Sequence, residues 1–144
     1  MFVWRCKRAI AVLLAVITGV AVCFFLRVGY VSQFAKYSGV RTYYLDSRSS
    51  QSLQKEHLSG LDFLRVRGES VYMDGVGEEI VHEILQDFKG SILWTEEAGG
   101  VRSYYCYSPK LATGIVVLGR RVNLHIAVGE SGCAVGSPII FGGL

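Results

Sequence analysis

The stretch that decides the fold runs from residue 121 to 141 and reads RVNLHIAVGESGCAVGSPIIF. Its first part alternates: Val122, Leu124, Ile126 and Val128 are apolar, and Asn123, His125 and Ala127 lie between them. This period of two predicts a strand with one buried face. The glycines of GESG (129–132) suit a turn, and 133–141 is predicted to return as the last strand. Pro138 lacks an N–H, so we assign it a structural role at an edge strand or a bulge.

Further strands are predicted before this stretch. The sequence SILWTEE (91–97) ends at Gly99-Gly100, and VRSYYCYS (101–108) follows that turn. Next, GIVVL (114–118) leads into Gly119-Arg120, a pair that suits a tight hairpin turn, which gives Gly119 a structural role. Farther upstream, the alternation in LDFLRVRG (61–68) predicts one more strand.

One helix is predicted between these strands. Asp74-Gly75 is a candidate helix start, and Glu78 and Glu79 would lie in the first turn, where they suit the helix dipole. The apolar residues recur at helical spacing: Ile80, Val81, Ile84, Leu85 and Phe88. Gly90 suits the end of a helix of about fourteen residues. The order of elements over 61–144 therefore predicts an α+β domain, a small antiparallel β-sheet with one main helix packed on a face.

The N-terminal region is strongly apolar. Residues 9–26, AIAVLLAVITGVAVCFFL, contain no charged side chain and would span about 27 Å as a helix, close to the thickness of a bilayer core. This run predicts a transmembrane anchor over 9–27, with a cleaved signal peptide as the alternative. Arg5, Lys7 and Arg8 predict a cytoplasmic N-terminus over 1–8 and a C-terminal domain outside the cell membrane, that is, a single-pass protein.

Residues 28–60 are mostly polar and include the low-complexity patch SRSSQS (47–52). Such composition offers little apolar surface to offset the entropy of ordering. The segment is therefore interpreted as a linker or a partly ordered segment. Tyr43, Tyr44 and Leu45 interrupt its polar sequence, and the alternative is that this part forms a strand or rests on the domain.

Charge argues against a nucleic-acid partner. The chain has 15 Lys and Arg residues and 12 Asp and Glu residues, but three of the basic residues precede the apolar run. The remaining 15 − 3 = 12 basic residues balance the acidic ones. Because phosphate neutralisation supplies most of the affinity for nucleic acid, a balanced domain is not expected to bind it.

Cysteines and histidines give no sign of a metal site or of a cofactor. Cys106 and Cys133 lack metal-like spacing and are interpreted as free thiols, with a disulfide as the alternative. His82-Glu83 resembles the start of a zinc-protease motif, but Gln86 stands where the second histidine is required. We therefore expect a solvated helix face there, no bound metal and no cofactor.

Aromatic residues provide the only candidate binding surface. Tyr105 and Tyr107 fall on one face of a predicted strand, and Trp94 lies in its expected neighbour. Exposed aromatic side chains can stack on sugars or anchor a protein partner, although they also pack sheet faces. Asn123, if buried, is expected to satisfy backbone groups between strands.

The C-terminal part resembles a known family. Tyr107-Ser108-Pro109, then Gly119 with the run Val122–Ala127, then Gly136-Ser137-Pro138-Ile139 are similar in order to motifs of the YwmB-like family. The resemblance covers 61–144, and most clearly 101–141. It implies half of a fold like that of the TATA-box-binding protein, in an extracytoplasmic protein of spore-forming bacteria without an established activity.

These inferences combine into one functional expectation. The chain is expected to be a membrane-anchored, extracytoplasmic, non-catalytic interaction module at the cell envelope. The resemblance links it to sporulation or the cell wall, with a protein or cell-wall partner. The alternative is an envelope enzyme acting on wall material, with Tyr105, His125 or Glu83 as acid or base, which would require these groups to converge in one pocket.

Overall fold

The computed structural model describes the backbone of residues 2–27 and 30–142. In the first helix it describes the side chains of Lys7 and of residues 9–24. The other side chains of the predicted cytoplasmic N-terminus lie outside the described residues, as do positions 28 and 29 of the predicted linker. The chain divides into two compact units, Met1–Val31 and Ser32–Leu144.

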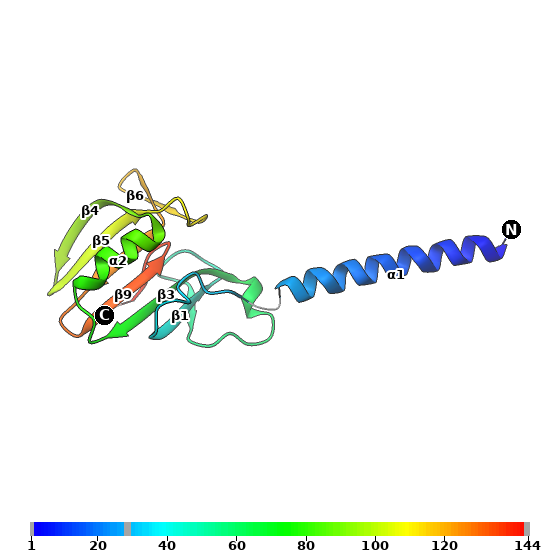
Figure 1. Ribbon diagram of the computed structural model, residues 1–144, viewed down its shortest axis with the longest axis horizontal. Helices are drawn as coiled ribbons and strands as arrows, with labels where there is room; N and C mark the ends of the chain where they lie inside the picture. Colours follow the sequence, from blue (N-terminus) through cyan, green and yellow to red (C-terminus); the bar gives the residue numbers. More distant parts are fainter. Residues whose placement is uncertain (1, 28–29, 143–144) are drawn as a thin grey trace. The chain divides into compact units, whose positions relative to one another are not determined.

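The first unit contains one helix, α1 (Phe2–Arg27), drawn in blue in Figure 1. Among the described residues, no helix combines the length and the apolar character needed to cross a membrane. The prediction of a transmembrane anchor over 9–27 is therefore wrong, and so is the single-pass location that was inferred from it.

The second unit is an antiparallel sheet with a helix. Its elements are β1 (Val40–Leu45), β2 (Leu53–Lys55), the 3-10 helix η1 (Asp62–Leu64), β3 (Val66–Asp74), α2 (Glu79–Phe88), β4 (Ser91–Ala98), β5 (Val101–Tyr107), β6 (Ile115–Val117), β7 (Arg120–Val122), β8 (Leu124–Val128) and β9 (Gly132–Ser137). Seven strands form one sheet in the order β2-β1-β3-β9-β8-β5-β4, and β6 and β7 form a separate hairpin. The fold prediction thus fails in its transmembrane helix, whereas the antiparallel sheet is present.

The large sheet consists of two halves. One half is β2-β1-β3 and the other is β9-β8-β5-β4, and they meet where β3 pairs with β9 from Glu69↔Ser137 to Asp74↔Gly132. All six residues of β9 are buried. The last strand in the sequence therefore occupies the middle of the sheet, and the edge position expected from Pro138 is wrong.

Helix α2 covers one face of this sheet. It connects β3 in the middle to β4 at the edge and buries Val81, Ile84 and Phe88. Strand residues of the same core include Val71, Leu124, Ile126 and Val135, each with no exposed surface. The helix is shorter than predicted, because the chain enters it at Glu78 and not at Asp74, and Lys89 ends it in a left-handed conformation.

The segment predicted as a linker is part of the domain. Phe34 is fully buried, and the centroid of its ring lies 5.2 Å from the centroid of the Phe88 ring in α2. Farther along, Tyr44 and Leu45 in β1 are buried as well, and β1 pairs with β3 along its whole length. Isolated aromatic residues in a polar stretch therefore contribute to the core, because distant strands provide the surface that buries them.

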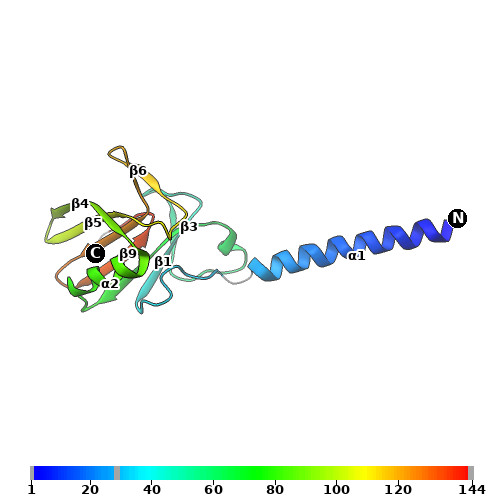
Figure 2. The same cartoon turned by 45° about the horizontal axis from the view of Figure 1, so that its top comes forward.

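One hairpin turn lies where it was predicted, and the other, predicted at Gly119-Arg120, begins one residue earlier. Gly99 and Gly100 both have positive φ between β4 and β5, as a tight turn requires. Between β6 and β7 the turn is formed by Leu118 and Gly119, with φ of 49° and 73°. Figure 2 shows the β6–β7 hairpin projecting from the domain beside the sheet.

The burial of Phe34 predicts a large stability effect for a segment that resembles a linker. Phe34→Ala should lower the free energy of unfolding by about 3–5 kcal/mol, as large-to-small core changes do. Urea denaturation of the full chain measures this change. Leu61→Ala is the control, because Leu61 is 56% exposed. An effect of Phe34→Ala no larger than that of the control would show that residues 32–39 do not pack on the domain.

Candidate functional site

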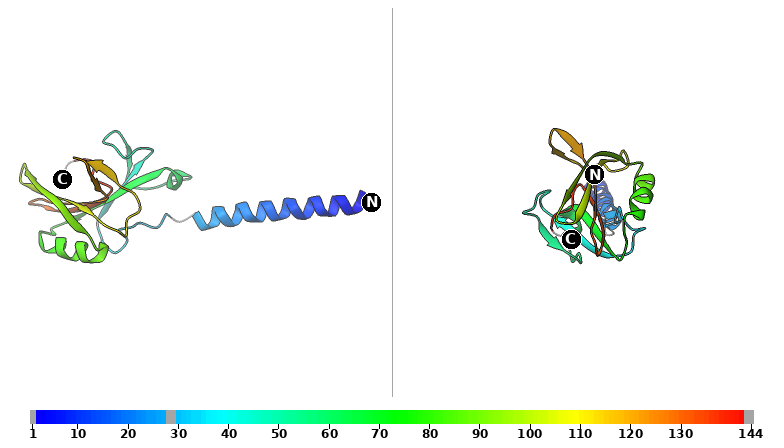
Figure 3. Two further views of the ribbon diagram at one scale, coloured as in Figure 1. Left: turned by 90° about the horizontal axis from the view of Figure 1, so that it is seen from above. Right: turned by 90° about the vertical axis from the view of Figure 1, so that its left-hand side faces the viewer.

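The face of the sheet opposite α2 carries the candidate site. Figure 3 shows α2 along one face and the C-terminal end of the described chain on the other. Because side chains alternate along strands, Ser70 and Tyr72 point away from the core residues Val71 and Met73. We call this side the open face.

A groove with a volume of about 460 Å³ lies on the open face. It is lined by Val40, Thr42, Tyr44, Gln54, Ser70, Tyr72, Ala134, Ile140, Phe141 and Gly142. None of these residues is charged. The lining combines aromatic rings with hydroxyl and amide groups, which suits a neutral ligand that has both apolar surface and hydrogen-bonding groups.

The C-terminal segment forms one wall of the groove. The Phe141 N–H donates to the Tyr44 hydroxyl over 3.1 Å, and the two rings meet edge to face with centroids 5.2 Å apart. Gln54 Nε2 donates to the Phe141 carbonyl over 3.3 Å. The Tyr44 hydroxyl also lies 2.7 Å from Ser70 Oγ, and burial raises its pKa. Residues from β1, β2 and β3 therefore hold this wall in place.

Gly136 permits the C-terminal segment to cross the open face. A Cβ at this position would lie 2.8 Å from Ile140 Cγ1 and 3.1 Å from Ser70 Cβ. The Ser137-Pro138 peptide bond that follows is cis, and Pro138 is buried. Pro138 thus has its structural place at the end of an interior strand, where the chain leaves the sheet and returns over its face.

Next to this segment, three rings stack on the open face. Trp94 and Tyr105 are nearly parallel with centroids 4.6 Å apart, and Tyr105 and His125 likewise at 4.5 Å. They come from β4, β5 and β8, and the pairs Trp94↔Tyr105 and Tyr105↔His125 lie opposite each other. The structure thus joins two of the predicted binding residues and adds His125. Tyr107, 36% exposed at the end of β5, makes no ring contact among the described residues.

Burial keeps His125 neutral. Its side chain is 6% exposed, and desolvation lowers its pKa to about 4. Because Nδ1 accepts the Ile140 N–H over 3.2 Å, the ring proton belongs on Nε2. His125 therefore links the ring stack to the C-terminal segment as a neutral acceptor. The alternation of 122–128 placed His125 away from the core, but only the register between β5 and β8 shows its partners.

Asn123 holds a loop together. The Ser108 N–H donates to its Oδ1 over 2.6 Å, and its Nδ2 donates to the carbonyls of Ser108 and Leu111 over 2.7 and 2.8 Å. The side chain has no exposed surface. Asn123 thus satisfies three backbone groups of the connection between β5 and β6. Gly119 lies in the hairpin turn that follows this connection.

The remaining candidates lie apart from the open face. Cys106 and Cys133 are buried free thiols on β5 and β9, which β8 separates, and burial raises the pKa of each to about 12. His82 is exposed on α2 and hydrogen-bonds Gln86, so this pair lies on a solvated helix face. Among the described residues, no group of three His, Cys, Asp or Glu side chains could hold a metal ion.

Comparison of the chain with protein-family models, with curated proteins and with solved structures gives no match. The resemblance to the YwmB-like family, and to half of a TATA-box-binding-protein fold, stays a prediction.

The pKa of His125 predicts how stability depends on pH. Its folded pKa, about 4, lies below the ordinary value of 6.5, so the unfolded state binds the proton first as pH falls. The contribution of His125 is complete above pH 6.5, declines between 6.5 and 4, and changes no further below 4. The total loss is about 3 kcal/mol. Urea denaturation at pH 7 and 5 should show about 2 kcal/mol of this loss. The same comparison in His125→Asn isolates the contribution of His125. Equal pH dependence in both proteins would contradict the burial of a neutral ring.

The Asn123 contacts predict a second stability effect. Asn123→Ala leaves three buried backbone groups without partners and should lower the free energy of unfolding by about 3 kcal/mol. Ser91→Ala is the control, because Ser91 is exposed and its hydroxyl donates to the Tyr107 carbonyl over a long distance of 3.4 Å. Thermal and urea unfolding measure both changes. A loss below about 1 kcal/mol for Asn123→Ala would contradict the structural role.

Proposed function

We propose that the domain is a non-catalytic binding module that takes an uncharged saccharide in the groove of the open face. The observation that carries this proposal is the lining of the groove, which is free of charge and combines Tyr72 and Phe141 with hydroxyl and amide groups. Sugars present hydroxyls at their edges and C–H groups on their faces, so they use both kinds of contact. The groove volume of about 460 Å³ falls within the usual range for small-ligand sites.

The positions of the titratable groups support binding over catalysis. An enzyme would require Tyr105, His125 and Glu83 to converge. Glu83 lies on α2, exposed and paired with Lys36 over 2.8 Å, whereas Tyr105 and His125 lie on the opposite side of the sheet. His125 is neutral, and the thiols of Cys106 and Cys133 stay protonated at neutral pH. We therefore prefer a binding role to that of an enzyme acting on wall material.

The test is a titration of the full chain with the trimer of N-acetylglucosamine, a neutral sugar that offers both hydroxyl and amide groups. Nuclear magnetic resonance should show chemical-shift changes at Thr42, Tyr72 and Phe141. Val40→Asp should weaken binding at least about tenfold, because the bound sugar would displace the water that hydrates the carboxylate. Val40 is 55% exposed, so this change should leave the fold intact.

Leu53→Asp is the matched control, because Leu53 is a similarly exposed strand residue, at 48%, that does not line the groove. It should bind the trimer as the unmodified chain does. Shifts confined to residues outside the groove, or equal weakening by the two aspartates, would contradict the proposal. The absence of any shift at millimolar trimer would contradict the choice of saccharide.

A further inference from the structure

The β6–β7 hairpin exposes apolar side chains at its tip. Val116 and Leu118 are 75% and 79% exposed, far more than Ile92 or Leu64, which are also exposed. Val116 lies directly opposite Arg121 across the hairpin, and Val117 lies opposite Arg120. One side of the hairpin therefore places an apolar residue next to an arginine. We call Val116, Leu118, Arg120 and Arg121 the hairpin tip.

The backbone at Leu118 is also unfavourable for its residue type. Leu118 has φ of 49° in a two-residue turn where asparagine or glycine is the stable choice. A leucine there combines an unusual backbone conformation with an exposed apolar side chain. A residue that has both an unfavourable backbone conformation and an exposed apolar side chain is typical of a position used for binding.

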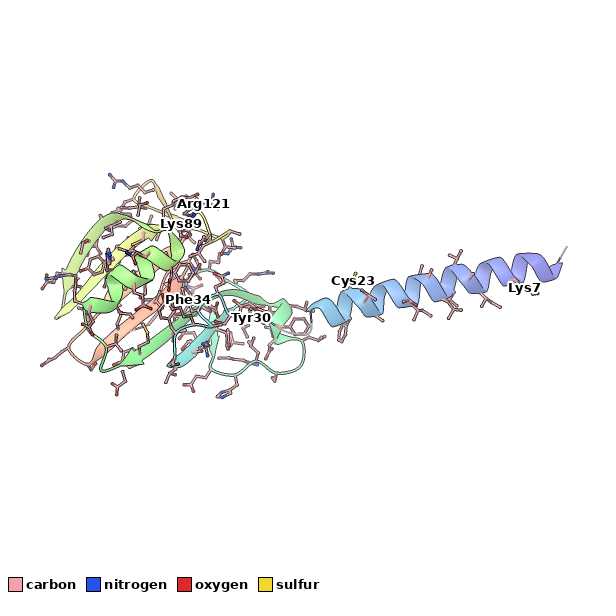
Figure 4. The ribbon with its side chains drawn as sticks, in the orientation of Figure 1. Lys7, Cys23, Tyr30, Phe34, Lys89 and Arg121 are labelled. Atoms are coloured by element: carbon pink, nitrogen blue, oxygen red, sulfur yellow. The ribbon has the colours of Figure 1, made fainter. Side chains whose placement is uncertain are left out.

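Three cations around the hairpin form no ion pair within the part of the chain that the structure describes. The ion pairs there use Lys36, Lys55, Arg65 and Arg102, and none uses Arg120, Arg121 or Lys89. Arg120 and Arg121 instead donate to the carbonyls of Leu93 and Ala112 over 2.8 and 2.9 Å. Figure 4 shows Lys89 and Arg121 at the same end of the domain. This end is therefore positively charged and its guanidinium groups are fixed in place.

We propose that the hairpin tip docks on an acidic protein surface that offers an apolar contact to Leu118 and Val116. The charge is complementary to carboxylates, and the exposed leucine gains free energy only where a partner removes it from water. Fixed guanidinium groups suit a partner whose carboxylates are also fixed, more than a fluid lipid surface. Nucleic acid would use the cations and leave the apolar tip exposed. This surface is separate from the groove, so the inference does not depend on the proposed function.

The test compares two polymers on the immobilised full chain, a random copolymer of glutamate and tyrosine and polyglutamate of the same length. Biolayer interferometry should show that the copolymer binds at least about tenfold more tightly, because it adds an apolar contact to the charge. Leu118→Asn should remove this preference and leave polyglutamate binding unchanged. The same variant should raise the melting temperature, since asparagine tolerates the left-handed turn. Loss of the preference for the copolymer would thus accompany a gain in stability, a combination that partial unfolding of the variant cannot produce.

Val116→Ser is a second variant and should act in the same direction on binding. Leu53→Asn, at an exposed apolar position outside both the hairpin and the groove, is the control and should leave both affinities unchanged. Equal affinity for the two polymers, or an unchanged preference in Leu118→Asn, would overturn the inference. Tighter binding to phosphatidylserine vesicles or to duplex DNA than to the copolymer, abolished by Leu118→Asn, would also overturn it in favour of that partner.

Discussion

The structure depends on the pairing of β3 with β9, because among the described strands this is the one ladder that joins the two halves of the large sheet. Small residues make the pairing possible. A Cβ at Gly132 would lie 2.4 Å from the Met73 carbonyl oxygen, and one at Gly68 would lie 2.6 Å from that of Ser137. Larger side chains at these positions would push the strands apart. All six residues of β9 are buried, so the strand is enclosed on both faces.

This arrangement gives the two faces different roles. On the core face, α2 and the segment around Phe34 exclude water from Val71, Ile126 and Val135. On the open face, the chain that leaves β9 at Pro138 returns across the sheet and forms one wall of a neutral groove. The uncharged groove and the cationic hairpin tip differ in chemistry and come from different parts of the chain. This difference is the reason why we propose different partners for them.

The sequence predicted what depends on local pattern. The period of two in 122–128 identified the core residues of β8, and glycines marked the turns of two hairpins. The exposed face that this period also predicted is wrong, because all five residues of β8 are buried. It could not predict what depends on long-range pairing. Phe34 and Tyr44 lie in a polar stretch and are buried only by distant residues. Pro138 indicated an edge strand because proline lacks an N–H. That prediction failed because no local feature of the sequence shows that β9 pairs with β3 in the middle of the sheet. The stack of His125 on Tyr105 follows from strand register, which one sequence does not contain.

Amide hydrogen exchange on the full chain tests the central claim most directly, namely that β3 and β9 join the halves into one cooperative sheet. The account predicts that amides of Val71, Val135 and Ile126 exchange most slowly and at the same free energy, equal to that of global unfolding. It also predicts faster exchange at the edges, in β2 and β4. Separate opening of β1–β3 at a free energy several kcal/mol below that of β8 and β9 would contradict it.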